Sequence, residues 1–260
     1  MGNIIYKKSQ GIEYIQFKKL LELGVTHCYT LKDENIDFTT GNPNEKESFN
    51  KICNVLNIKR EQIYVPTQTH KDNIKCIDLN MFKKNLSNTD ALITDKKDIV
   101  LATRNADCIL LFFYDPIKKV IANVHSGWRG TFQKIAEKTV IKMITNYGCK
   151  SEDILCFINP CIRKCHFEVD EDVKELCEGI FGFIGRNHEF IQMGDIKEGK
   201  QKYFIDTVLI NKILLNDIGV KEKNIFDCEI CSMCNSDKIN SSRYEGKNFK
   251  RAIALIGLTF

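Results

Sequence analysis

Long hydrophobic runs are absent from the 260-residue sequence. No apolar stretch approaches the ~18 residues that a membrane-spanning helix needs. The first residues, MGNIIYKKSQGIEYIQF, lack the apolar centre of a secretory signal. A strong charge excess is also missing, because 38 Lys and Arg residues face 34 Asp and Glu residues, for a net charge of +4. This balance favours neither a nucleic-acid nor a membrane partner, so we expect a soluble, cytoplasmic protein.

Internal repeats, low-complexity tracts and linkers rich in Pro, Gly or Ser are likewise absent. With 43% hydrophobic residues, a chain of this length can bury a sizeable core in one large unit. We therefore expect residues 1–260 to form a single domain, present as a monomer or a weak homodimer.

Cysteine, in contrast, is plentiful, with 12 residues in the chain. Without an export signal, we expect most of them to be thiols that pack as small hydrophobic side chains. Cys228, Cys231 and Cys234 stand apart, because their C-x₂-C-x₂-C spacing resembles part of an iron–sulfur or zinc motif. Cys161 or Cys165 could supply a fourth ligand. The alternative is a loop that carries incidental thiols.

Apolar periodicity alternates between helix and strand patterns along the chain. The helix patterns cover residues 44–57, 129–147, 169–181 and 206–218, and strand patterns cover residues 12–17, 25–31, 63–70, 90–95, 98–108 and 120–125. Residues 108–115, CILLFFYD, are apolar almost throughout, which is typical of a strand buried on both faces. This mixture predicts an α+β (mixed α/β) fold, a single layered domain with mixed β-sheets flanked by helices.

Three of the expected strands end in polar clusters that contain a side chain able to bind a metal. VPTQTH ends on His70, ATRNADC ends on Cys108, and the apolar run before HSGWRG ends on His125. Side chains from distant parts of a chain converge at strand ends. Two imidazoles and one thiolate are a known ligand set for catalytic zinc, with a fourth position left for water or substrate. The alternative is two hydrogen-bonded histidines and a core thiol.

Several residues next to these three carry side chains that can move protons or bind anions. Asp107 adjoins Cys108 and can accept a proton or orient a ligand. Arg129 follows Gly-Trp at the start of an expected helix, where a planar guanidinium can grip phosphate or carboxylate. A surface salt bridge for Arg129 and core packing for Trp128 are the alternatives. Gln68 and Asn105 can supply neutral polar contacts in the same loops.

The run TDALITD…LATRNADCILLFFYDPIKKVIANVHSGWRGT resembles the YfiH/YlmD-like family. Its members have been called laccase-domain or multicopper polyphenol oxidases, peptidoglycan editing factors and purine nucleoside phosphorylases. VPTQTH resembles the family's Q-x-H segment, and NPCIRKCHFEVDEDV its G-P-x-I-x-x-C-C-Y-E-V stretch. The resemblance covers the chain from about residue 60 to its end. Asn159, His166 and Phe167 depart from the family pattern, which puts in doubt any role of its second Cys or its Tyr hydroxyl.

The resemblance implies a YfiH-like fold and a metal site made of His70, Cys108 and His125. Zinc is the implied metal, with copper as the alternative. The implied activity is phosphorolysis of adenosine, inosine, guanosine and 5′-methylthioadenosine, with adenosine deamination as a side activity. The implied partners are therefore a small-molecule nucleoside and phosphate.

For this chemistry the expected catalytic residues are Asp107, Arg129 and Glu168. Asp107 is the first candidate to move a proton and Glu168 the second, because protonation of the leaving base and attack by water both need an acid or a base. Arg129 would hold phosphate, with help from Arg243 or Arg251. The residues expected to contact substrate are Gln68, Asn105, Trp128 and Arg243.

Two other enzyme classes compete with this interpretation. A multicopper phenol oxidase needs many histidine ligands, and the five histidines of this chain cannot supply them. A hydrolase that edits cell-wall precursors would use Cys108 as nucleophile and His125 as base. The metal content of the purified protein separates that hydrolase from a zinc enzyme.

Overall fold

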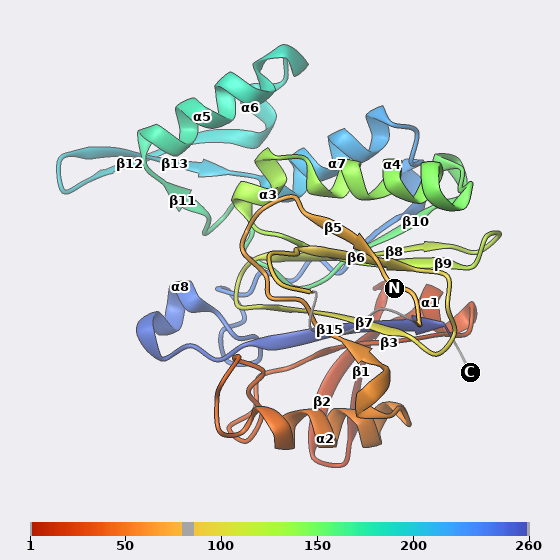
Figure 1. Cartoon of the computed structure of the whole chain (residues 1–260). Coiled ribbons are helices and arrows are strands. Elements are labelled where there is room, and N and C mark those ends of the chain that lie inside the picture. The colour runs from red at the N-terminus through yellow and green to blue at the C-terminus, as the bar shows by residue number, and fades with distance from the viewer. Residues whose placement is uncertain (1, 80–85, 259–260) are drawn as a thin grey trace.

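The computed structural model of the chain describes residues 2–79 and 86–258. Two six-stranded sheets lie face to face at its centre, with helices on their outer faces (Figure 1). The first sheet has the order β1-β2-β3-β15-β7-β4. Its strands are β1 (Ile4–Ser9), β2 (Ile12–Phe17), β3 (Val25–Thr30), β4 (Ile63–Tyr64), β7 (Val100–Asn105) and β15 (Ala252–Leu258).

The second sheet has the order β14-β10-β8-β9-β6-β5. Both sheets are mixed, because β4 pairs parallel with β7, β5 with β6, and β10 with β14, while the other neighbours in the two sheets are antiparallel. The second sheet consists of β5 (Ile74–Cys76), β6 (Ala91–Thr94), β8 (Ile109–Asp115), β9 (Val120–Ser126), β10 (Leu155–Ile158) and β14 (Ile225–Asp227).

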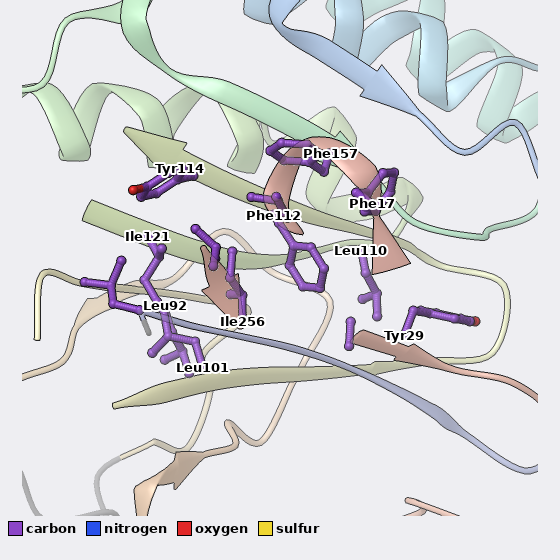
Figure 2. Packing of buried hydrophobic residues seen from close by; sticks show 14 of the residues in the cluster. Phe17, Tyr29, Leu92, Leu101, Leu110, Phe112, Tyr114, Ile121, Phe157 and Ile256 are labelled. Atoms are coloured by element: carbon purple, nitrogen blue, oxygen red, sulfur yellow. The ribbon is translucent and has the colours of Figure 1, made fainter. Parts of the chain in front are cut away.

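The main core fills the space between these two sheets (Figure 2). Tyr29 and Ile256 of the first sheet meet side chains of the second sheet such as Leu110, Phe112 and Phe157. All five are at most 1% exposed. Burial of such apolar area, at roughly 25 cal/mol per Å², is the main force that holds the sheets together.

Helices cover the outer faces of the two sheets. Helix α2 packs on the first sheet, where Phe49 and Ile52 join a cluster with Val100 of β7. Helices α4 and α7 lie over the second sheet (Figure 1). The bounds of these helices and of α1 are α1 (Lys18–Glu22), α2 (Glu45–Leu56), α4 (Ile135–Tyr147) and α7 (Thr207–Asp217).

Strand β8 is buried along its whole length, as its apolar sequence predicts. Leu110 and Phe112 point into the core between the sheets, whereas Leu111 and Phe113 pack beneath α4. Its two neighbours, β9 and β10, are both antiparallel to it. Burial on both faces therefore arises here from the stacking of four layers and not from a parallel sheet.

A third, three-stranded sheet lies beside the two large ones and is covered by helices α5 and α6 (Figure 1). Polar and apolar residues alternate only weakly along its strands, so the sequence pattern does not predict them. These elements are β11 (Glu168–Val169), α5 (Glu171–Phe181), α6 (Asn187–Phe190), β12 (Ile191–Lys197) and β13 (Lys200–Ile205).

The structure divides the helix expected over 129–147 into α3 (Trp128–Phe132) and α4. Lys134 has a left-handed φ of 61°, which ends one helix and lets the next start in a new direction. The other expected helices form, and Asp206 caps α7 by accepting the backbone N–H of Leu209 at 2.9 Å. The predicted mixed α/β architecture is confirmed. Within the described residues, no helix has the length and apolar character to cross a membrane.

Candidate metal centre

The structure brings the expected ligands His70, Cys108 and His125 together where the two central sheets meet. His70 follows β4 and Cys108 follows β7, which are parallel neighbours in the first sheet, while His125 lies near the end of β9 in the second. One donor atom from each side chain lies within 4.8 Å of the other two. The imidazole rings of the histidines are 4.8 Å apart and nearly perpendicular.

A buried asparagine fixes how the two sheets meet beside this cluster. Asn123 lies on β9, two residues before His125, and donates from its Nδ2 to the carbonyls of Leu101 and Ala254, both at 2.9 Å. Its Oδ1 accepts from the hydroxyl of Thr103. A buried amide whose polar atoms are all hydrogen-bonded specifies one arrangement, because any shift of a sheet would leave it unsatisfied.

The Asp90 carboxylate, which the sequence interpretation did not single out, orients His125. It accepts from His125 Nδ1 at 2.8 Å, which leaves Nε2 to bind a metal. A carboxylate behind a ligating histidine fixes the orientation of the ring and increases its basicity. The signal that could have found Asp90 is a charged residue immediately before the buried strand ALIT.

Asp90 also shapes the loop that carries His70. Its two oxygens accept the backbone N–H groups of Thr69, His70 and Lys71 at 2.9–3.2 Å. His70 has a φ of 59°, a left-handed conformation that is uncommon outside glycine. Such strain persists only where surrounding contacts enforce it, and it clusters at functional sites. One carboxylate therefore positions two of the three expected ligands.

Cys108 lies in an environment that favours its thiolate. Burial raises the pKa of the Cys108 thiol, but the neighbouring His125 and His70 more than offset this and bring it to about 6. Burial lowers the pKa of His125, whereas the Cys108 sulfur and Asp90 raise it, to about 9 overall. The thiolate is the form of cysteine that binds a metal. The pair is thus poised as thiolate and imidazolium until a metal replaces the proton.

Gly127 leaves the room that the cluster needs. A Cβ atom at this position would lie 3.1 Å from Cys108 Sγ and 3.1 Å from His70 Cδ2. The Cβ of any other residue would therefore be in close contact with the side chains of Cys108 and His70, two of the three expected ligands. His70 is exposed, Cys108 is half-buried and His125 is buried, so the cluster opens to one side. Two imidazoles and a thiolate with an open side fit a zinc ion that keeps one position for another ligand.

Two cavities adjoin the cluster, and Cys108 borders both. The polar one has a volume of about 190 Å³ and is lined by all three expected ligands together with Arg104 and Arg251. The other, of about 160 Å³, is more apolar. Its walls include Trp128, Ile162, Phe167, Asp107 and Arg243. Ser242, which the sequence did not single out, lines both cavities.

The two neutral polar candidates are engaged with backbone groups at the polar cavity. Gln68 forms a pair of 2.8 Å hydrogen bonds with the backbone N–H and carbonyl of Arg104. Asn105 donates to the carbonyls of Cys108 and Pro160 and accepts from the hydroxyl of Tyr29. Both side chains therefore hold the loops around the cluster in place as well as lining the cavity.

Asp107 lies at the apolar cavity with both carboxylate oxygens occupied. It accepts from the hydroxyls of Ser232, Ser241 and Ser242 and from the backbone N–H of Arg243, at 2.6–2.8 Å. With a φ of 89°, Asp107 is the second residue at the cluster, after His70, that has a left-handed backbone conformation. Through these four bonds, Asp107 holds the segment that leads into helix α8 (Ser242–Glu245) against the metal centre.

The remaining candidates lie further out. The guanidinium of Arg129 is exposed and lies over the Trp128 ring, 4.1 Å from its centre, and Arg129 does not line either of the two cavities. Glu168 pairs with Lys197 at 2.5 Å, away from both cavities. Arg243 lines the apolar cavity, and its side chain donates to the carbonyls of His166 and Glu168.

The family model described as multi-copper polyphenol oxidoreductase laccase matches residues 24–259. The chain belongs to this family. The match contains all three residues of the candidate metal centre, so the resemblance inferred from the sequence is confirmed. The laccase family name refers to copper, and the Cys/His cluster is consistent with a metal-binding site of that general kind.

Several curated proteins resemble this laccase-family chain. It is 28% identical to the purine nucleoside phosphorylase LACC1 of Homo sapiens over 243 residues, 90% of this chain and 53% of that protein. The chain thus spans about half the length of this relative. A purine nucleoside phosphorylase of Clostridium acetobutylicum is 29% identical, with 96% of this chain and 98% of that protein covered. An adenosine deaminase, RL5, from an unknown prokaryotic organism is 29% identical over 75% of each chain.

Two solved structures share the fold of this laccase-family chain. The hypothetical protein YfiH of Bacillus licheniformis superimposes with a TM-score of 0.86 at 23% identity, covering 98% of this chain and 99% of that one. YlmD from Geobacillus stearothermophilus gives a TM-score of 0.81 at 19% identity, covering 99% and 100%. At these identities the likeness establishes the YfiH-like fold alone.

Proposed function

We propose that this protein is a zinc-dependent purine nucleoside phosphorylase that also deaminates adenosine. The observation that carries the proposal is the open cluster of His70, Cys108 and His125 between a cavity with two arginines and an apolar, aromatic one. The names of the relatives from Homo sapiens and Clostridium acetobutylicum support phosphorolysis, and that of RL5 supports deamination. Adenosine, inosine, guanosine and 5′-methylthioadenosine are the proposed substrates.

The two cavities suit the two parts of this reaction. Trp128, Ile162 and Phe167 offer apolar surface for a purine ring. Arg251 and Arg104 offer positive charge for phosphate on the other side of Cys108. Arg104 already pairs with Glu45 at 2.5 Å, whereas no salt bridge engages Arg251 among the described residues. Arg251 is therefore the first candidate to hold phosphate, and Arg129, whose guanidinium lies over Trp128 outside both cavities, is the second.

In phosphorolysis a phosphate oxygen bonds to the anomeric carbon while the glycosidic bond breaks and its electron pair stays with the purine. The protein has to position phosphate and supply a proton to the leaving base. Ser242 lies between the two cavities and donates to Asp107 Oδ2 at 2.8 Å. In this proposal the proton comes from the attacking phosphate, the Ser242 hydroxyl passes it to the leaving base, and the Asp107 carboxylate orients that hydroxyl. A bound zinc ion would supply a Lewis-acid centre with one open coordination position.

A phosphate-dependent assay on a panel of nucleosides tests this proposal. Zinc-loaded protein is expected to release free base from adenosine and inosine only when phosphate is present, with ribose 1-phosphate as the second product by ³¹P NMR. The metal content is measured on the same batch. Absence of base release from every purine nucleoside by fully zinc-loaded protein would refute the assignment.

A cysteine hydrolase is the second candidate, because one observation favours it. Asp90, His125 and Cys108 form an acid–base–nucleophile row, in which the Asp90 oxygen lies 2.8 Å from His125 Nδ1. His70 beside the same sulfur is not needed for such a row, and it favours the metal site. Iodoacetamide alkylates a free Cys108 thiolate. If it abolishes the catalytic activity of the protein to the same extent in the presence and in the absence of zinc, that result would support the hydrolase.

A copper oxidase of phenols is the least supported reading of the family name. Among the described residues, only His70 and His125 share a cluster with Cys108, and His166 belongs to a different group. A multicopper oxidase needs a set of many histidines beside its electron-transfer site. The chain offers no such set in the described part of the structure.

A further inference from the structure

A second group of metal-binding side chains lies outside the candidate metal centre. Cys165 and His166 come from the loop between β10 and β11, and Cys231 and Cys234 come from the loop between β14 and α8. Their four donor atoms all lie within 4.8 Å of one another. None of the four residues lines the two cavities beside Cys108. This group, which we name the CCHC cluster, takes no part in the proposed reaction.

The spacing of the donors matches a tetrahedron around one zinc ion. Bonds of about 2.3 Å to sulfur and about 2.0 Å to nitrogen place tetrahedral sulfurs about 3.8 Å apart and sulfur and nitrogen about 3.5 Å apart. The Cys165 sulfur lies 3.6 Å from that of Cys231 and 3.8 Å from that of Cys234. The His166 Nδ1 lies 3.2, 3.7 and 3.4 Å from the sulfurs of Cys165, Cys231 and Cys234.

The tertiary structure selects these ligands from a larger set of cysteines. The sequence run contains Cys228 as well, but its sulfur contacts the Arg163 guanidinium at 4.0 Å and packs against the main core. Cys161 is fully buried in the cluster between the second sheet and helices α4 and α7. The C-x₂-C pair of Cys231 and Cys234 therefore faces the adjacent pair Cys165-His166, with no role for the other two thiols.

The two loops are held in register without any ion. Cys161 pairs with Cys231 in an isolated β-bridge, where the Cys161 N–H donates to the Ile230 carbonyl at 3.3 Å and the Ser232 N–H donates to the Cys161 carbonyl at 2.9 Å. Arg163 forms two hydrogen bonds with the Asp227 carboxylate at the base of the loops. The donors thus converge on a framework that is already built, which lowers the ordering cost of binding.

We propose that the CCHC cluster binds a structural zinc ion through Cys165, His166, Cys231 and Cys234. Four protein ligands fill a tetrahedral zinc and leave no position for water or substrate, which is the hallmark of a structural site. Cys165 and Cys234 are exposed and Cys231 is buried, and zinc coordination explains why these three thiols converge.

The ion would stabilise the wall of the apolar cavity. Ser232, beside Cys231, donates to Asp107 at 2.6 Å. The Arg243 side chain donates to the His166 carbonyl at 3.3 Å, so the second loop is tied to the cavity as well. Residues 228–241 contain no helix or extended strand, and Cys231 joins the neighbouring loop through a single β-bridge. A zinc ion would add a second link between the two loops, through Cys234 and the Cys165-His166 pair.

Metal analysis by mass spectrometry on reduced protein, purified without added metal, tests this inference independently of the enzyme activity. We expect about two zinc ions per chain in the wild type, one in Cys234→Ser and one in Cys165→Ser. Cys108→Ala is expected to keep one, held by the CCHC cluster. Cys228→Ser is the matched control, because it changes a thiol of the same run that points elsewhere, and it should keep two.

X-ray absorption at the zinc edge on the Cys108→Ala protein provides a measurement that does not depend on folding of the cluster variants. A shell of three sulfurs at about 2.3 Å and one nitrogen at about 2.0 Å is expected. A Cys234→Ser protein with as much zinc as the wild type, or a Cys108→Ala protein without zinc in a sulfur-rich shell, overturns the proposal, whereas one zinc in a wild type whose Cys108→Ala variant keeps it would count against the open cluster alone. Iron in place of zinc, or a Cys165 disulfide found by mass spectrometry of reductant-treated protein, also overturns the proposal.

Discussion

The two Cys/His clusters of this protein use the same chemical groups in different surroundings. The open cluster of His70, Cys108 and His125 has three donors, lies between two cavities and is braced by the carboxylate of Asp90. The CCHC cluster has four donors, lies between two loops and borders neither cavity. The number of protein donors and the adjoining space, more than the residue types, therefore separate a reactive site from a structural one.

Substitution of Cys108 by Ala should have the largest effect on the open cluster and on activity. It removes the only thiolate of the open cluster, so we expect at least a ~1,000-fold loss of kcat/KM, beyond the ~10–100-fold typical of changes behind a metal ligand. Steady-state phosphorolysis and zinc content measure the effect. Cys228→Ser, at a thiol of similar burial, should retain wild-type activity. Full activity of a metal-free Cys108→Ala protein would exclude the metal scheme.

Asp90→Asn should weaken the open cluster while the CCHC cluster stays intact. The amide cannot match the carboxylate that accepts from His125 and from the loop carrying His70, so zinc affinity at the open cluster should fall about 10–100-fold. Competition with a chromogenic chelator resolves the two sites. Asp95→Asn, at the other end of strand β6, is the control. Equal weakening of both sites would contradict the local role of Asp90.

Gly127→Ala should have a smaller effect on the same cluster. The added methyl would lie 3.1 Å from Cys108 Sγ and from His70 Cδ2. Donors held by a metal cannot move aside, so zinc affinity should fall roughly tenfold, about 1.4 kcal/mol at 25 °C. Isothermal titration with zinc measures this. Gly179→Ala, where a Cβ meets no atom within 4 Å, should leave both affinities unchanged.

His27 belongs to neither cluster, and its protonation makes the stability of the fold depend on pH. Burial lowers its pKa to about 4, and its ring nitrogens bond to the Val25 carbonyl and the Phe17 N–H. The unfolded chain takes up this proton below about pH 6.5 and the folded protein only near pH 4, so folding stability falls as the pH drops through this window.

Substitution of His27 removes its contribution to the pH dependence of stability, so that the two clusters can be compared without it. Between pH 7 and 5.5 the His27 contribution amounts to about 1 kcal/mol of lost stability. His27→Gln should be less stable at pH 7 but should lose about 1 kcal/mol less on acidification, measured by urea unfolding at equal zinc loading. His188→Gln, at an exposed histidine of α6, is the control. An unchanged pH dependence in His27→Gln would rule out this assignment.

Much of the fold follows from local patterns in the sequence. Helix α2 and strands β2, β3 and β8 form within one or two residues of their expected bounds, because apolar periodicity over one element is a local property. The break at Lys134 was not predicted, since a single left-handed residue leaves the apolar spacing of 129–147 unchanged. The third sheet was missed because its strands β11–β13 are short or partly polar.

The candidate site was predictable where chemistry is carried by residue type. Histidine and cysteine at strand ends, together with the family resemblance, indicated His70, Cys108 and His125 as the ligands, and the structure places their donors together. Asp90 was missed because a carboxylate acquires its role only through what it contacts. Arg129 and Glu168 were chosen for their charge, and the structure places them outside the two cavities, where their proposed roles remain to be tested.

Local patterns in the chain predict the layered α/β class, the metal-capable residues and the C-x₂-C-x₂-C run. They do not predict which cysteines share a site, because the pairing of Cys165-His166 with Cys231 and Cys234 depends on a loop contact across 66 residues. Such contacts arise from the packing of whole sheets and leave no local periodicity. Packing of the sheets thus places Cys108 with two histidines in a three-donor centre beside the cavities, and it places Cys165, Cys231 and Cys234 with one histidine in a four-donor cluster between two loops.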